Sequence, residues 1–247
     1  MTCIFCGQHG KSSSEHVIPS WTDPFLSRLP PTGERPGGKR MTHRFTPGPE
    51  SEAQMREWHN DGPDLRTNAV CEECNTGWLS DLETAVAGLI GPMIVGQPTV
   101  LQTEDQKAAA AWAYKTVLLM QMIRPSGLRV IPPDRFRQLH DSRRPPSDVR
   151  VWLARREGGN AAHDALNEIR VAGPGLSVPG FFSLLALGRI VILVAGRLVP
   201  GPERMRIGSE VDPRITAQIW PASSRAVAWP PEEPLEDLSA GSVVARL

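Results

Sequence analysis

Two Cys-x-x-Cys pairs, Cys3/Cys6 and Cys71/Cys74, contain all four cysteines of the 247-residue chain. A two-residue spacer lets one tight turn present both sulfurs to the same ion, and four thiolates suit tetrahedral Zn²⁺. Two disulfides would be unusual in a reducing cytosol. The spacing therefore predicts a structural zinc site that joins two distant stretches of the chain. The interval between the pairs exceeds that of a simple zinc ribbon, which indicates an inserted segment.

Polar residues suited to a different chemistry lie beside the cysteines. Glu15 and His16 follow the first pair, Asn68 precedes the second pair, and Asn75 directly follows it. An imidazole is suited to accept a proton from water at neutral pH. Carboxylate and amide oxygens are ligands that Mg²⁺ or Mn²⁺ prefers. These residue types suit metal-assisted phosphodiester hydrolysis, in which a cation neutralises a phosphate oxygen and stabilises the leaving alkoxide.

The spacing of the two adjacent residues limits how they act together. Neighbouring side chains of a regular strand point to opposite sides, so Glu15 and His16 reach one phosphate only if the strand bends or one ligand comes from a turn. Both arrangements stay open. Asn68 can orient the imidazole of His16. His43 and His59, between the cysteine pairs, are alternative candidates for a further ligand or an orienting group.

The order of these residues resembles the HNH, or ββα-metal, nuclease family. In its zinc-stapled members, which include phage endonuclease VII, an acidic-His dipeptide and a hydrophobic-hydrophobic-Pro segment lie between two Cys-x-x-Cys pairs. An Asn or His directly follows the last cysteine. The segment Glu15-His16-Val17-Ile18-Pro19, the run Cys71-x-x-Cys74-Asn75 and the place of Asn68 match this layout. The resemblance covers about residues 3–85.

The resemblance implies a divalent-metal-dependent endonuclease acting on DNA. His16 would be the general base, assisted by Asn68, and Glu15 and Asn75 would bind a catalytic Mg²⁺ or Mn²⁺. Glutamate stands where aspartate is commoner in the family, and the segment from 22 to 64 is unusually long. Two other hypotheses remain: a zinc-stapled module that binds nucleic acid without cleaving it, and a protein-interaction scaffold.

The whole chain is expected to be α+β. Residues 1–88 should form the zinc-stapled ββα module with its long insertion, and residues 89–247 an α+β region for substrate binding or dimerisation. Residues 89–102 are expected to be a packed connection. The pattern of apolar residues predicts helices and strands at the following places. The helices are 107–123 and 134–140, and the strands are 41–45, 149–154, 168–171, 181–187, 190–195 and 215–220.

Charge and composition limit the partners and the cellular location that we expect for the protein. The formal net charge is zero, so it gives no indication of a polyanionic partner. Residues 124–156 are locally rich in arginine and are expected either to follow a phosphate backbone or to form a solvated surface. The sequence has no signal-peptide pattern and no apolar run long enough for a membrane span. We therefore expect a cytoplasmic protein with no membrane partner, and leave a homodimer open.

Overall fold

The computed structural model describes residues 1–31, 41–46, 56–60, 65–173, 176–199 and 211–236 of a chain that mixes α-helices with β-sheets. Its helices and helical turns are η1 (Ser20–Thr22), α1 (Asp23–Leu26), α2 (Glu72–Cys74), η4 (Asn75–Leu79), α3 (Ser80–Ile94), α4 (Thr103–Met122), η5 (Ser126–Leu128) and α5 (Asp134–Ser142). Its strands are β1 (Glu15–His16), β2 (Met41–Thr46), β3 (Arg56–Asn60), β4 (Arg66–Thr67), β5 (Thr99–Leu101), β6 (Val149–Arg155), β7 (Ala162–Gly173), β8 (Leu176–Leu187), β9 (Ile190–Arg197), β10 (Thr216–Trp220) and β11 (Val227–Trp229).

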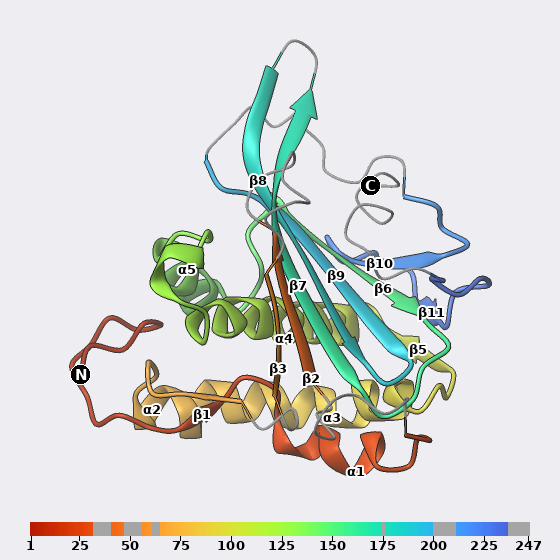
Figure 1. Ribbon diagram of the computed structural model, residues 1–247, viewed down its shortest axis with the longest axis horizontal. Helices are drawn as coiled ribbons and strands as arrows, with labels where there is room; N and C mark the ends of the chain where they lie inside the picture. Colours follow the sequence, from red (N-terminus) through yellow and green to blue (C-terminus); the bar gives the residue numbers. More distant parts are fainter. Residues whose placement is uncertain (32–40, 47–55, 61–64, 174–175, 200–210, 237–247) are drawn as a thin grey trace.

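A seven-stranded sheet dominates the architecture, in the order β10-β6-β9-β8-β7-β2-β3 (Figure 1). Its neighbouring strands are antiparallel, except that β2 runs parallel to β7. The strands expected at 181–187 and 190–195 lie in β8 and β9, which form a hairpin and meet at Gly188, whose φ of 57° is easily adopted by glycine. The expected strand at 41–45 is also present, and it extends this sheet.

Both faces of the sheet are buried, so its central strands are apolar on both sides. One face belongs to the main core that also includes α3 and α4, and the other forms a second apolar cluster with Leu235. Alternate residues supply the two faces, as the two-residue period of a strand requires. On β6, Val151 and Leu153 belong to the main core, whereas Trp152 and Ala154 belong to the second cluster.

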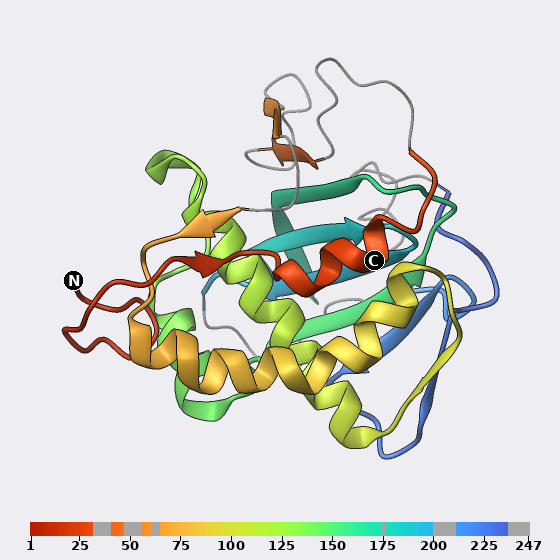
Figure 2. The same cartoon turned by 90° about the horizontal axis from the view of Figure 1, so that it is seen from below.

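Helix α4 lies between the sheet and α3, in contact with β6, β9 and β10 on one side and with α3 on the other (Figure 2). An unbroken run from Ala109 to Gln121 is buried, as expected for a helix covered on all sides. The expected helix is confirmed, and it begins four residues before the expected range, at Thr103. Gln102 caps it, and the carboxylate of Asp105 accepts from the Gln102 N–H at 2.9 Å.

At one end of the molecule a short ribbon precedes the cysteine-bearing helix. Strands β1 and β4 pair antiparallel, and the chain then continues into α2, η4 and α3 (Figures 1 and 2). Strands β2 and β3 come from the segment between β1 and β4, yet they join the large sheet. One buried core includes residues from both of the expected ranges, 1–88 and 89–247.

Helix α3 corrects one expectation. It continues to Ile94, through part of the segment expected to be a connection. Within this helix Val86 is buried and Ala85 is exposed. The widened turn η4, with a non-helical Gly77, rotates the helix that follows relative to the regular period.

Candidate metal centre and its surroundings

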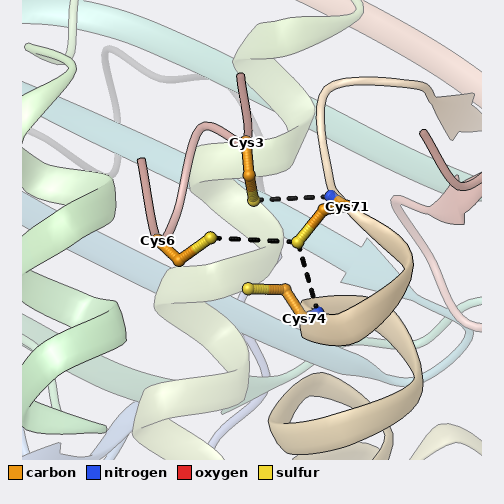
Figure 3. A group of neighbouring side chains, drawn as sticks. All are labelled: Cys3, Cys6, Cys71 and Cys74. Carbon is orange, nitrogen blue, oxygen red and sulfur yellow. Dashed lines mark hydrogen bonds between the residues drawn. The ribbon is translucent and has the colours of Figure 1, made fainter. Parts of the chain in front are cut away.

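The four cysteines converge at the end of the molecule that carries the ribbon. Their sulfur atoms all lie within 4.8 Å of one another, and the side chains point toward a common centre (Figure 3). The Sγ atoms of Cys6 and Cys71 are 3.8 Å apart. With a zinc–sulfur bond of about 2.3 Å, the edge of a regular tetrahedron is about 3.8 Å. The cluster could therefore bind a metal such as zinc.

Backbone N–H groups also point at these sulfurs. The N–H of Cys71 donates to Cys3 Sγ and the N–H of Cys74 donates to Cys71 Sγ, both at 3.4 Å. Burial raises the pKa of the Cys3 thiol, but backbone donors from Cys71, Cys6 and Phe5 outweigh that effect and bring the pKa to about 7. Burial likewise raises the pKa of Cys71 and Cys74. A bound cation would supply the charge that keeps all four sulfurs ionised.

Aromatic residues connect the cysteine cluster with the rest of the fold. Phe5 lies within the first Cys-x-x-Cys segment, between Cys3 and Cys6. It contacts Trp78 edge-on, with ring centroids 5.1 Å apart, and Phe136 of α5 at 5.4 Å. Gly7 has a φ of 71°, and the guanidinium of Arg137 lies where a side chain would be. Helix α5 thus packs on the first Cys-x-x-Cys turn, beside an open hollow of about 630 Å³.

His16 lies on β1 directly opposite Arg66 of β4, and Glu15 lies opposite Thr67. The ribbon is regular here, so Glu15 and His16 face opposite sides, as the sequence led us to expect for a strand without a bend. Glu15 is buried, whereas His16 is only partly buried and its Nε2 atom is shielded from solvent.

The Glu15 carboxylate lies in a buried cluster of charges. Lys115 Nζ is 3.0 Å from Glu15 and 2.7 Å from Glu83, and the Lys115 side chain is 0% exposed. Desolvation raises the pKa of Glu15, and the Lys115 ammonium opposes that rise. Lys115 is shielded from solvent because α4 is covered on all sides at this point. Lys115 links β1, which carries His16, to α3.

Replacement of Lys115 by methionine is expected to destabilise the fold by about 3–5 kcal/mol, because it leaves the Glu15 carboxylate buried without its cation. Denaturant unfolding measures this change. The double variant Lys115→Met/Glu15→Gln should recover part of the loss. Lys107→Met is the matched control on the same helix, where Lys107 pairs with an exposed Glu104, and it should change stability little. Equal losses for Lys115→Met and Lys107→Met would contradict the assigned role.

The other candidate residues lie close to the cysteines in sequence. Asn75 is partly buried and begins the widened turn η4, immediately after Cys74. Asn68 is exposed, and its backbone carbonyl accepts a hydrogen bond from Ser12 Oγ at 3.0 Å. His43 and His59 are on β2 and β3, at one edge of the large sheet. The metal ligation expected of Asn75, and the orienting role expected of Asn68, stay predictions.

The arginine-rich segment 124–156 stabilises the fold through many of its guanidinium groups. Arg124 forms a buried ion pair with Asp164, and Arg135 binds Asp148 through two hydrogen bonds of 2.7 Å. Others donate to backbone carbonyls: these are Arg129, Arg143, Arg150, Arg155 and Arg156. Contact of this segment with a phosphate backbone stays a prediction. In the structure, most of these arginines bind carboxylates or backbone carbonyls of the protein itself.

Comparisons with models of protein families, with curated proteins and with solved structures find no match to this chain. Among the helices in the described ranges, none combines the length and the apolar character needed to cross a bilayer.

Proposed function

We propose that the protein is a divalent-metal-dependent endonuclease of the HNH type that hydrolyses phosphodiester bonds of DNA. The observation that supports this most is the joint arrangement of three features at one end of the fold. These are the antiparallel pairing of β1 with β4, the helical segment that follows β4 directly, and the four-cysteine cluster that joins Cys3 and Cys6 to the start of that segment. Strand, strand and helix in this order are what the resemblance implies.

In this proposal zinc has a structural role. Cys3 and Cys6 precede β1, whereas Cys71 caps the N-terminus of α2 and Cys74 is the last residue of α2. An ion bound by all four sulfurs would hold the strand bearing His16 and the turn bearing Asn75 in a fixed relation. Closed four-thiolate sites leave no position for substrate, so the chemistry belongs to the neighbouring oxygen and nitrogen donors.

His16 takes the proton from the attacking water. Asn75 is the proposed oxygen ligand, on the His16 side of β1, for Mg²⁺ or Mn²⁺, which when bound would neutralise charge on the phosphate and the leaving oxygen. An amide oxygen is a donor that fits such a cation. Glu15 faces the other side of β1 and holds the Lys115 ammonium at 3.0 Å, so the expected ligand role of Glu15 requires β1 to bend at this point. Asn68 would orient the imidazole.

Nicking of supercoiled plasmid by the zinc-loaded wild-type protein tests the proposed activity. We expect open-circular product to accumulate when Mg²⁺ or Mn²⁺ is added, and none without an added divalent ion. Parallel reactions on single-stranded DNA and on RNA define the substrate. A protein that holds zinc and is folded, yet cleaves none of these substrates with either ion, would refute the proposed activity. DNA binding without cleavage would then favour the non-catalytic binding module.

A further inference from the structure

We propose that Arg66 binds the phosphate group on which His16 acts, so that the β1–β4 ribbon presents a base and a cation side by side. This inference rests on the proposed function and adds a phosphate-binding residue to it. Arg66 is exposed, and it is the cross-strand partner of His16.

The register of the ribbon places the two side chains on one face. Val17 N–H donates to the Leu65 carbonyl at 2.7 Å, which makes 17 and 65 a hydrogen-bonded pair. Hydrogen-bonded and non-hydrogen-bonded pairs alternate in an antiparallel ladder, so His16 and Arg66 form a non-hydrogen-bonded pair. In such pairs the Cα atoms are only about 4.5 Å apart and the side chains are in closest reach of each other.

The opposite face of the ribbon, which carries Glu15, contacts α4. Glu15 points toward α4 and is held there by Lys115, so the face with His16 and Arg66 is turned away from α4. A guanidinium is planar and presents donors that match two phosphate oxygens at once, whereas the imidazole beside it is suited to proton transfer.

The charge of the substrate gives Arg66 a role beside His16. A phosphodiester carries a negative charge, and a cation on the same face of the ribbon would bind it. Arg66 lies directly opposite His16 on that face, so its guanidinium is placed to supply that charge.

Plasmid nicking by zinc-loaded variants, measured at limiting enzyme over a range of KCl concentrations, tests this role. Arg66→Gln is expected to lower the nicking rate by about 10- to 100-fold, the range that corresponds to one hydrogen bond to a charged group. The slope of log rate against log KCl should become shallower by about 0.9 when one phosphate contact is lost. Arg66→Lys should keep the slope and recover part of the rate, because it keeps the charge without the planar fork.

Arg225→Gln is the matched control. Arg225 is also exposed, but it precedes β11 at the opposite end of the molecule from β1, so both its rate and its salt slope should equal those of the wild type. Zinc content and the unfolding midpoint of every variant establish that the fold is retained. An Arg66→Gln variant that nicks like the wild type with the same salt slope would overturn the role of Arg66 alone. Absence of nicking by the wild type would overturn the nuclease proposal and this inference together.

Discussion

His16→Ala is expected to lower divalent-dependent plasmid nicking by about 10²–10⁴-fold, the typical contribution of a general base. Alanine removes the imidazole and keeps the backbone of β1, whose pairing with β4 needs no side chain at this position. Zinc binding and stability should remain, because Glu15 and Lys115 fix the strand from the other face. The measurement is the initial rate of open-circular product formation with Mn²⁺ at saturating enzyme.

His9→Ala is the matched control for this experiment. His9 is also a histidine of the N-terminal segment, but it is exposed in the loop after Cys6 and contacts Thr2, so its loss should leave the rate unchanged. Equal rates for His16→Ala and the wild type would remove His16 from the chemistry. A loss in both variants would indicate that the N-terminal segment, rather than one imidazole, had been disturbed.

Cys74→Ser is expected to have the largest effect on the fold. Structural zinc contributes roughly 10–16 kcal/mol in model peptides, which equals or exceeds the whole stability of a typical domain, about 5–15 kcal/mol. Serine supplies a hydroxyl in place of the thiolate, so the site loses one of its four ligands. We expect substoichiometric zinc in the purified variant and rapid amide hydrogen exchange in residues 1–20 and 65–79.

The large sheet should respond differently, because its strands β6, β8 and β9 have their own buried core. Their amides should keep most of their protection in Cys74→Ser. Ser80→Ala, an exposed change at the start of α3, is the control and should keep full zinc content. A Cys74→Ser protein that holds one zinc ion and melts at the wild-type temperature would show that the four-cysteine cluster has no structural role.

Local sequence patterns predicted the elements whose signals are local. The two Cys-x-x-Cys pairs predicted a four-sulfur cluster because each pair fixes its own turn, and their convergence is confirmed. The hairpin β8–β9 and the start of α5 were also predicted from short-range signals. By contrast, the parallel pairing of β2 with β7 joins segments more than a hundred residues apart. No spacing within either segment indicates that contact.

The burial of Lys115 could have been inferred from its surroundings. Lys115 lies in a helix with apolar residues around its whole circumference, close to Tyr114 and Val117. Such a helix has no solvent-exposed face for a lysine. A buried lysine needs a carboxylate partner. Glu15 is a candidate because it lies just before the apolar residues Val17 and Ile18. Arg66 was not predicted because its partnership with His16 depends on strand register, which becomes visible only when β1 and β4 are paired.

The central claim is that a second cation, bound through oxygen, lies beside His16. Anomalous diffraction from crystals of the zinc-loaded protein soaked in Mn²⁺ measures this directly. We expect zinc at the four cysteines and a separate manganese peak in contact with Asn75, on the face of β1 that carries His16. Manganese bound only to surface carboxylates elsewhere, with the imidazole turned away from Asn75, would contradict the claim.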